Sequence, residues 1–481
     1  MEQERSHINV KGKTQVRETL IRSNTEVICE VGLSHSSEET SVMGAERRAK
    51  VISFGDCLTT NPIRMNKQPQ TRGIPITKQM VFNAYKKVKR NRGSAGVDNE
   101  SITEFDENLK GNLYLLWNRM SSGTYFPPPV KEVLIPKGDG KMRKLGIPTV
   151  RDRIAQEVIK SYIEPKLEKE FSENSYGYRP LKNTHQAVEA VRKNTRKYSW
   201  VIDLDIKGFF DNMSYEKLMK ALGKHFEEKW VMMYVERWLK APILTKDSGL
   251  IGREKGTPQG GVISPILANL FLHYAFDKWF VSNYPILSFV RYADDIIIHC
   301  NSETEAEEVF ASVRERLSEC ELELNQEKSK IAYCKDGKRT NNYKTIKFDF
   351  LGFSFQPRTA KNKNSGNLFL GFDCAISRKS ETKIAKELRD SSFHKLTKSS
   401  IYEIAKTFNP KLRGWYNYFC KFRPHKLNRI FGLFNWRLIK WAVKKFKRFN
   451  GSMRQAGNWI RRLAIAETTL FVHWQYGFGG A

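Results

Sequence analysis

The stretch that decides the fold is Phe289-Val290-Arg291-Tyr292-Ala293-Asp294-Asp295-Ile296-Ile297-Ile298, in which two β-prone apolar runs flank a pair of acids. The pattern predicts a strand, a tight turn and a second strand, with Asp294 and Asp295 at or beside the turn. Side chains alternate along a strand, so only a turn lets adjacent acids approach one spot. Carboxylates held so close repel each other unless a cation lies between them, and hard oxygen ligands suit Mg²⁺. A hairpin with a solvated Asp-Asp tip is the alternative, and this stretch alone does not decide between the two.

A second acidic stretch runs Val201-Ile202-Asp203-Leu204-Asp205-Ile206-Lys207-Gly208-Phe209-Phe210-Asp211. In a strand, Asp203 and Asp205 share one face and the apolar residues between them take the other. If this strand lies beside the hairpin at residues 289–298, acids from both form one site. Such a site can hold two cations about 4 Å apart, the arrangement that supports in-line nucleotidyl displacement. Capping or pairing with a lysine is the alternative for Asp203 and Asp211.

Net charge is the strongest signal in the composition: 82 Lys and Arg against 52 Asp and Glu give +30. An excess of this size indicates a polyanionic partner, either nucleic acid or an anionic membrane surface. The 481 residues allow two to four domains. No apolar run is long enough to cross a bilayer, and the polar start is not a secretory signal, so a cytoplasmic or equivalent organellar location is expected. The seven cysteines lack any C-x-x-C pair, which predicts free, mostly buried thiols.

Two segments before the acidic sites carry clustered cations. Thr77 can cap a helix that ends in the basic run at residues 86–92, which is a solvated helix end or a phosphate contact. The strand at residues 130–136 leads into a β-hairpin with four cations near its tip. A cationic hairpin tip can cover a triphosphate, although alone it reads as an exposed basic turn. Between the acidic sites, the Gly-rich turn at residues 256–261 leads into a helix, and its Gln259 offers an amide to a base or sugar.

The last part of the chain is helical and cationic. A helix is predicted from Glu303 to Leu322 and an alternating strand pair from Phe348 to Phe355, followed by a loose, basic boundary. No Asp or Glu occurs between Glu403 and Glu467, where Trp and Tyr are interleaved with Lys and Arg. Helices with one aromatic and one basic face fit a nucleic-acid clamp. Aromatics in the core and cations in solvent would explain the aromatics, but not the missing acids.

Together these motifs resemble a reverse transcriptase, specifically the reverse transcriptase with maturase activity encoded by mobile group II introns. The resemblance runs from about Lys78 to the end. It rests on an ordered set of motifs: Asn91-Arg92-Gly93-Ser94-Ala95-Gly96-Val97-Asp98, Leu145-Gly146-Ile147-Pro148, Tyr176-Gly177-Tyr178-Arg179-Pro180, Asp205 to Asp211, Thr257-Pro258-Gln259-Gly260, Tyr292-Ala293-Asp294-Asp295, Leu351-Gly352-Phe353 and Leu412-Arg413-Gly414-Trp415-Tyr416. Each motif alone is modest evidence, whereas all of them in this order are highly specific.

The resemblance implies an α+β fold, a right-hand polymerase of fingers and palm with an antiparallel palm sheet, followed by a helical thumb or maturase domain X. The expected divisions are a flexible or partly ordered leader at 1–70, an N-terminal extension of the fingers at 71–125, fingers and palm at 126–356, a linker at 357–375 and the thumb at 376–481. Because the chain stops soon after His473 and has no cysteine after Cys420, we expect no endonuclease domain.

The family's site residues carry over by motif. Asp205 and Asp294 would be the metal-binding carboxylates for two Mg²⁺ ions (or Mn²⁺), with Asp295 beside them and the Ile206 carbonyl as a further ligand. The implied nucleotide-binding residues are Lys137, Arg143, Gln259, Lys328 and Phe210, the last of which would exclude a 2′-hydroxyl. Leu351 and Gly352 would belong to the primer grip. The implied RNA-binding residues are Lys86, Lys87, Lys89, Arg90, Arg92, Arg413, Lys444 and Lys445.

The implied activity is RNA-directed DNA polymerisation in retroelement mobility, together with help in splicing the parent intron RNA. The expected partners are that RNA, an RNA template with a DNA primer, deoxynucleoside triphosphates and target DNA, with no membrane partner. Two alternatives stay open: a splicing-only RNA-binding maturase, and a reverse transcriptase recruited to phage defence or CRISPR adaptation. The intact Asp205, Asp294 and Asp295 argue against the splicing-only reading.

Overall fold

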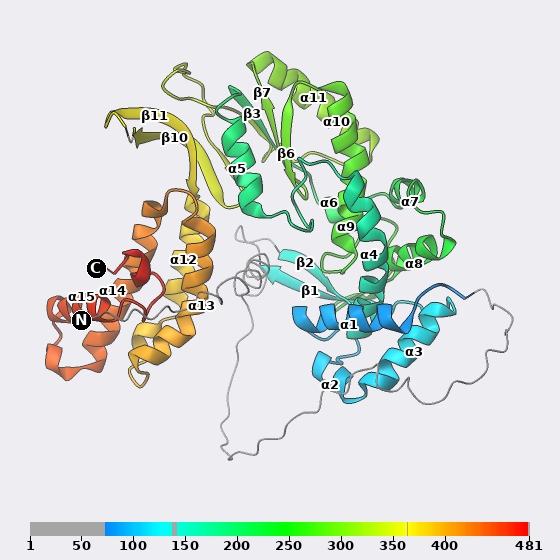
Figure 1. Cartoon of the computed structure of the whole chain (residues 1–481), viewed down its shortest axis with the longest axis horizontal. Coiled ribbons are helices and arrows are strands. Elements are labelled where there is room, and N and C mark those ends of the chain that lie inside the picture. The colour runs from blue at the N-terminus through cyan, green and yellow to red at the C-terminus, as the bar shows by residue number, and fades with distance from the viewer. Residues whose placement is uncertain (1–72, 137–141, 363, 480–481) are drawn as a thin grey trace, which may run out of the picture. The chain divides into compact units, whose positions relative to one another are not determined.

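Four antiparallel strands form the sheet that carries both acidic stretches, in the order β6-β7-β3-β8. They are β6 (Ser288–Tyr292), β7 (Asp295–Cys300), β3 (Trp200–Asp205) and β8 (Lys330–Tyr333). The computed structural model drawn in Figure 1 describes residues 73–136, 142–362 and 364–479, so the predicted leader at 1–70 lies outside the described residues.

The strand β3 divides its side chains between two cores. Ile202 and Leu204 join the larger core on one face, and Val201 joins a smaller core on the other. The helices α9 (Ser264–Leu272) and α11 (Glu303–Glu319) contribute to the first core, and α5 (Thr184–Asn194) contributes to the second. Asp203 and Asp205 therefore share the Val201 face, as the alternation predicts.

A second sheet contains the predicted cationic hairpin. Its order is β2-β1-β4-β5, with β1 and β2 antiparallel and β1 and β4 parallel. The strands are β1 (Val130–Pro136), β2 (Met142–Ile147), β4 (Ile243–Thr245) and β5 (Gly249–Ile251). The hairpin tip at residues 137–141 lies outside the described residues, and the implied nucleotide ligand Lys137 lies there with it.

The linker predicted for residues 357–375 is wrong. The strands β10 (Phe353–Lys361) and β11 (Leu368–Ile376) pair along their whole length, and β9 (Phe348–Phe350) adds to β10. The segment looks loose in sequence because the outer part of β10 is mostly polar and only partly buried, while the other end of the hairpin supplies Phe355, Phe372 and Cys374 to a core. Only the middle of the predicted linker, around residue 364, is a turn.

The other helices fall into two groups. Those before β10 are α1 (Lys78–Asn91), α2 (Ile102–Glu107), α3 (Leu109–Ser121), α4 (Val150–Glu170), α6 (Phe209–Asn212), α7 (Tyr215–Gly223), α8 (Lys229–Lys240) and α10 (Lys278–Asn283). Thr77 caps α1 through a hydrogen bond from Met80 N, as predicted. The C-terminal helices are α12 (Arg378–Asp390), α13 (Ile401–Phe419), α14 (Asn428–Lys445) and α15 (Met453–Ala466).

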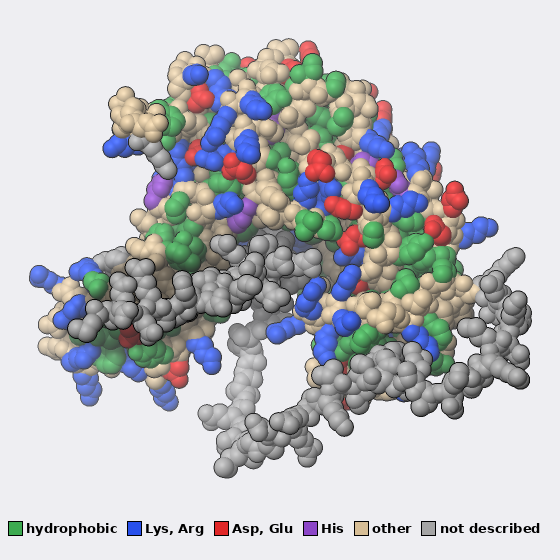
Figure 2. Space-filling view, viewed as in Figure 1, with side chains coloured by type: hydrophobic (Ala, Val, Ile, Leu, Met, Phe, Trp, Pro, Cys, Tyr) green, Lys and Arg blue, Asp and Glu red, His purple; other side chains and the backbone are tan. Residues whose placement is uncertain are grey.

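The C-terminal helices surround a hydrophobic core of their own. Trp441 and Trp415 are buried in it, so for these two the packing explanation is correct, whereas Trp436 is 44% exposed. Lys and Arg side chains project from this part of the chain on the face shown in Figure 2.

Two further sequence expectations concern cysteines and membranes. In the described part of the chain the five cysteines are free thiols and four of them are buried, as predicted. None of the helices within residues 73–136, 142–362 and 364–479 combines the length and the apolar character needed to cross a membrane.

Candidate active site

The turn between β6 and β7 carries the central acids. Tyr292 pairs with Asp295 across the hairpin, which leaves Ala293 and Asp294 as a two-residue turn. Ala293 has a φ of 55°, the left-handed conformation that such tight hairpin turns require. The predicted strand, turn and strand are therefore confirmed, with Asp294 in the turn and Asp295 at the first position of β7.

Asp205 ends β3 directly beside this turn, because it is the register partner of Asp295. Its backbone is held on both sides: its N–H donates to Ser329 Oγ at 3.1 Å, and its carbonyl accepts from Asn325 N at 2.8 Å. Lys328 Nζ lies 3.3 Å from Asp205 Oδ2. The structure thus brings Asp205, Lys328 and the hairpin turn together.

The acids of this site influence one another's protonation. Burial raises the pKa of Asp294, and the negative charge of Asp205 raises it further, while Arg143 opposes the shift. Asp295 retains exposed surface, yet lost hydration, followed by the charges of Asp294, Asp203 and Asp205, raises its pKa to about 7. Burial also raises the pKa of Asp203 to about 7 despite Lys330 at 3.7 Å. We call Asp203, Asp205, Asp294 and Asp295 the acidic cluster.

A buried ion pair between Arg291 and Asp277 stabilises the turn between β6 and β7. The Arg291 side chain is fully buried and donates to both carboxylate oxygens of Asp277, at 2.7 and 2.6 Å. Its remaining nitrogen donates to Asn269 Oδ1 at 3.0 Å and to the Ala293 carbonyl at 3.1 Å. Arg291 therefore fixes the backbone that presents Asp294. Sequence reasoning assigned no role to Asp277, although a lone acid inside the apolar stretch 262–280 was a usable signal.

The Gly-rich turn connects the acidic cluster to the cationic hairpin. A Cβ on Gly256 would lie 2.7 Å from the Phe210 carbonyl, and Thr257 N donates to that carbonyl at 2.7 Å. At the other end, Gly146 N in β2 donates to the Gln259 carbonyl at 2.7 Å. The turn is glycine-rich because two backbones approach it this closely.

Three of the implied nucleotide-binding residues are placed by this turn. The Arg143 side chain donates to Gln259 Oε1, so these two are in direct contact. Phe210 is buried and packs edge-to-face against Phe209, with ring centroids 5.4 Å apart. Its backbone lines the Gly-rich turn while its ring belongs to the larger core.

The implied primer-grip pair forms a second tight turn. Leu351 and Gly352 connect β9 to β10, both with positive φ, at 47° and 79°. C-terminal residues hold this turn: the Tyr418 hydroxyl donates to the Leu351 carbonyl at 2.8 Å, and Ser380 Oγ donates to the Gly352 carbonyl at 3.0 Å. The turn is therefore tied to α12 and α13.

Some of the implied RNA-binding cations already have a partner within the protein, and others have no ion pair in the described part of the chain. Lys87 and Lys89 on α1 are each 2.8 Å from an acid, Glu157 and Asp106 respectively. Lys445 donates to the Thr397 carbonyl at 2.8 Å. The others have no ion pair within the described residues: Lys86, Arg90, Arg92, Arg413 and Lys444.

The donors of the acidic cluster suit a divalent cation. Asp205 and Asp294 supply carboxylate oxygens, and the Ile206 carbonyl accepts no backbone hydrogen bond within the described residues. Within the same residues no three His, Cys, Asp or Glu side chains form a complete metal cage. Mg²⁺ does not need one, because it is usually bound by one or two carboxylates together with water and substrate phosphates.

Two family models match the chain. The model described as reverse transcriptase (RNA-dependent DNA polymerase) matches residues 135–355, and the one described as group II intron, maturase-specific domain, matches residues 382–458.

Three relatives support these matches. Protein YkfC of Escherichia coli (strain K12) is 32% identical over 280 residues, which cover 50% of this chain and 73% of that protein. Group II intron-encoded protein LtrA of Lactococcus lactis subsp. cremoris is 31% identical over 195 residues, covering 40% and 32%. An uncharacterized 91 kDa protein in the cob intron of Schizosaccharomyces pombe is 26% identical over 424 residues, covering 72% and 50%. The chain spans less than two thirds of the latter two proteins.

Proposed function

Since the chain belongs to the reverse transcriptase and maturase family of group II introns, we propose that it is an RNA-directed DNA polymerase. It copies intron RNA into DNA and binds the same RNA to assist its splicing. The observation that carries this proposal is the acidic cluster: carboxylates from two neighbouring strands lie at a turn fixed by buried Arg291, and Arg143, which contacts Gln259, is close enough to Asp294 to affect its pKa.

The proposed architecture is a right hand. The sheet β6-β7-β3-β8 is the palm, and β1 and β2 with residues 71–125 belong to the fingers. Residues 376–481 are the thumb and maturase domain, with Leu351 and Gly352 as the primer grip. The contacts from Tyr418 and Ser380 to this turn support the assignment, because they couple a primer contact to the thumb helices.

Reverse transcriptases generally use a divalent metal, typically Mg²⁺, and carboxylate and carbonyl oxygens such as those described above are ligands that this ion prefers. Asp205, Asp294 and the Ile206 carbonyl would hold two such ions. When bound, such ions would stabilise negative charge on the primer 3′-oxygen and on the pyrophosphate. Burial is the main cause of the raised pKa of Asp294, and the charge of Asp205 adds to it; a bound cation would relieve that repulsion.

The chain's own side chains bind and orient the substrates. The Arg143 side chain is close enough to Asp294 to affect its pKa. From there it can offset the negative charge that builds on the phosphates during the reaction. Lys328 is 62% exposed and flexible, so it can leave Asp205 for a phosphate when nucleotide binds. Gln259, held by Arg143, positions the base or sugar, and Phe210 closes the space that a 2′-hydroxyl would need.

A primer-extension assay tests the proposal. With a poly(rA) template, an oligo(dT) primer, dTTP and Mg²⁺, we expect incorporation by the full chain and none after chelation of the metal with EDTA. Asp294→Asn should lower the rate by about a hundredfold or more, since it removes a charge that the transition state depends on. The control, Asp247→Asn, neutralises an exposed acid outside the acidic cluster and should leave the rate unchanged. No incorporation by the wild type, or full activity of Asp294→Asn, would refute the proposal.

A further inference from the structure

A buried carboxylate and a buried amide on α4 lie next to the Gly-rich turn. Asp152 is 1% exposed and Gln156 is 2% exposed. Gln156 Nε2 donates to Asp152 Oδ2 at 2.9 Å, and Gln156 Oε1 accepts from Ile263 N at 3.2 Å. Ile263 directly precedes α9, which has no side-chain cap of its own. Gln156 therefore connects the carboxylate on α4 to the backbone at the start of α9.

Asp152 is held as an anion by neutral donors. The Tyr125 hydroxyl and the Trp238 indole N–H donate to Asp152 Oδ1, at 2.8 and 2.7 Å. The Asp152 backbone N–H donates to Thr149 Oγ1, so the acid lies in the first turn of α4, where the helix dipole favours a negative charge. Burial raises the pKa of Asp152 to about 6, and the three side-chain donors oppose this shift. The carboxylate is therefore ionised at neutral pH.

These partners allow the Gln156 amide only one orientation. An ionised carboxylate can only accept hydrogen bonds, so the NH₂ group of Gln156 must face Asp152. The backbone N–H of Ile263 can only donate, so the amide oxygen must face it. Rotating the amide by half a turn would leave buried polar groups without partners. Gln156 therefore holds the Ile263 backbone in a fixed position relative to α4.

The segment that Gln156 holds also carries Gln259. Gly261 N and Ser264 Oγ both donate to the Pro258 carbonyl, at 3.2 and 2.9 Å, which closes the turn on itself. A Cβ on Gly261 would lie 2.6 Å from Ser264 Oγ and 3.3 Å from Gln156 Oε1, so a side chain here would push the turn away from α4. The position of Gln259 therefore depends on the contact between the turn and Gln156.

We propose that Asp152 and Gln156 are positioning residues of the polymerase site, which hold the Gly-rich turn so that Gln259 and Arg143 meet the incoming nucleotide. The assignment rests on the proposed function for the identity of that substrate, a deoxynucleoside triphosphate. Both side chains are buried, and they act through the backbone of the turn rather than on the substrate itself.

A positioning role and a packing role differ in their kinetics. If the pair only stabilises the fold, weakening it lowers the amount of active protein, which reduces the apparent kcat and leaves the KM for dTTP unchanged. If the pair positions the turn, weakening it displaces Gln259 and Arg143, so the KM for dTTP rises. Urea unfolding, measured alongside, reports the stability of each variant.

Exchanging donor and acceptor across the pair tests the proposal in primer extension on poly(rA) and oligo(dT). Gln156→Glu sets a second carboxylate against Asp152, and Asp152→Asn sets a second NH₂ group against that of Gln156. Each single variant should raise the KM for dTTP about tenfold. In Asp152→Asn/Gln156→Glu, the new amide at 152 donates to the new carboxylate at 156, which still accepts from Ile263 N. The KM of this double variant should return to within about threefold of the wild-type value.

Gln156→Met keeps the size of the side chain and removes both of its hydrogen bonds, so it covers the case in which a charged single variant does not fold. It should also raise the KM for dTTP about tenfold. A double variant with a KM as high as those of the single variants, or a Gln156→Met protein that loses kcat alone, would overturn the proposal.

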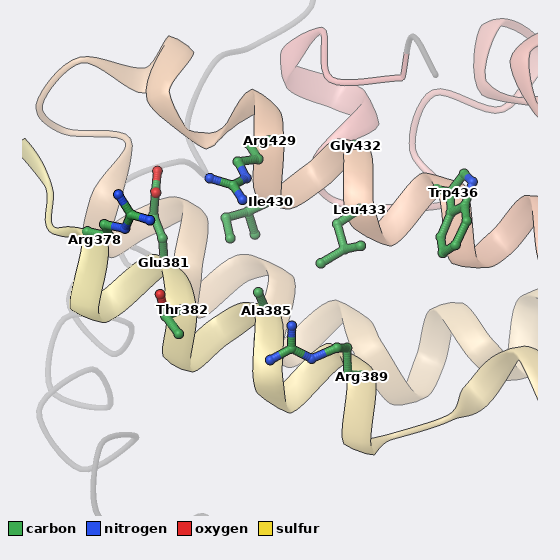
Figure 3. Close-up of a pocket in the computed structure, with 10 residues that line it drawn as sticks. All are labelled: Arg378, Glu381, Thr382, Ala385, Arg389, Arg429, Ile430, Gly432, Leu433 and Trp436. Carbon is green, nitrogen blue, oxygen red and sulfur yellow. The ribbon is translucent and has the colours of Figure 1, made fainter. Parts of the chain in front are cut away.

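Two control variants show whether the change in KM is specific. Gln79→Met removes a hydrogen bond between exposed side chains of α1 and should leave the KM for dTTP unchanged. Arg389→Gln/Arg429→Gln removes two exposed cations from a groove of about 580 Å³ between α12 and α14 (Figure 3). It should leave the KM for dTTP unchanged, whatever its effect on the binding of template and primer. A rise in this KM equal to that of Gln156→Met in either control would overturn the positioning role.

Equilibrium binding of dTTP to the full chain, with template and a dideoxy-terminated primer, separates this inference from the proposed function. Weaker dTTP binding by Gln156→Met, together with a wild type that binds dTTP but does not extend primers, would overturn the polymerase assignment alone. Normal extension by the wild type, together with unchanged dTTP binding by Gln156→Met, would overturn the positioning role alone.

Discussion

Phe210 is the single residue on which the choice of sugar should depend. It follows the strand that ends in Asp205, and its backbone is pressed against the Gly-rich turn. We predict that replacing Phe210 by valine raises ribonucleotide incorporation by about tenfold relative to deoxynucleotides, because a smaller side chain leaves room for the 2′-hydroxyl. Competition between dTTP and UTP in primer extension measures this ratio.

The control for Phe210 is its neighbour. Phe209→Leu alters a ring in the same core, so it reports on packing without reaching the sugar. Alanine at Phe210 would leave a cavity that costs about 3–5 kcal/mol of stability, so valine is the better test. Unchanged sugar selectivity in Phe210→Val would remove the gate assignment.

At this scale, charge and spacing predicted the local geometry of each acidic stretch, whereas the pairing of β3 with β7 was a condition that only the family resemblance supplied. The alternation of β3 and the turn after Tyr292 are local features, but the pairing of β3 with β7, which places Asp205 opposite Asp295 and beside the turn, is not. The partners of Lys87 and Lys89 were not predictable, because Glu157 and Asp106 reach them through tertiary packing. The same holds for Arg291, whose partner Asp277 lies on a preceding helical segment.

At the scale of an element, the β6–β7 hairpin depends on the ion pair between Arg291 and Asp277. We predict that Asp277→Asn lowers the free energy of unfolding by about 3–5 kcal/mol, because it leaves the Arg291 charge buried without a counter-charge. The double variant Arg291→Met/Asp277→Leu removes both charges and should recover most of that stability. Urea unfolding measures both values.

The double variant also separates stability from positioning. We expect it to fold without the hydrogen bond from Arg291 to the Ala293 carbonyl, which would leave the turn that presents Asp294 less ordered. We therefore expect a lower kcat and a higher Mg²⁺ concentration for half-maximal rate, with little change in the KM for the template and primer. A double variant with wild-type values for both would show that the pair serves stability alone.

The β10–β11 hairpin shows where element prediction failed. The sequence between Gln356 and Asn367 is polar and basic, and such composition is typical of a linker. Its strands pair with each other and bury only one end, so hydrophobic alternation is weak over most of their length. The hairpin is held together largely by hydrogen bonds between its two strands, and amino-acid composition does not indicate these.

At the scale of the whole molecule, the composition predicted a polyanionic partner and a helical C-terminal part. It did not predict which tryptophans of that part are buried and which are exposed. Trp441 and Trp415 pack in the C-terminal core, whereas Trp436 and the surrounding arginines lie on the surface. Helical spacing alone could not separate them, because all three residues occur among cations in sequence.

The stability of the C-terminal core should depend on His473. This side chain is fully buried, its Nε2 contacts Asn435 Oδ1 at 2.8 Å, and its Nδ1 has no partner within the described residues. Because Asn435 Oδ1 is an acceptor, Nε2 carries the proton and Nδ1 is unprotonated. Burial lowers the pKa of His473 to about 3. In the folded state the His473 ring therefore stays neutral at pH values where the unfolded chain protonates it, that is, below the ordinary histidine pKa of about 6.5.

Because the pKa of His473 is lower in the folded state, the free energy of unfolding decreases as the pH falls. Stability from neutral His473 is fully present above pH 6.5 and is lost as the pH falls toward 3. Between pH 7.5 and 5 we predict that the wild type loses about 2 kcal/mol relative to His473→Gln, which keeps a donor for Asn435 but cannot titrate. The comparison with His473→Gln cancels the buried acids, whose raised pKa values act in the opposite direction. Urea unfolding at both pH values measures the difference. The matched comparison with His425→Gln should give a smaller difference of the same sign, because His425 is an exposed histidine whose pKa burial and nearby cations lower without the near-complete burial of His473. Parallel pH profiles for the wild type and His473→Gln would mean that the C-terminal core accommodates the charged ring.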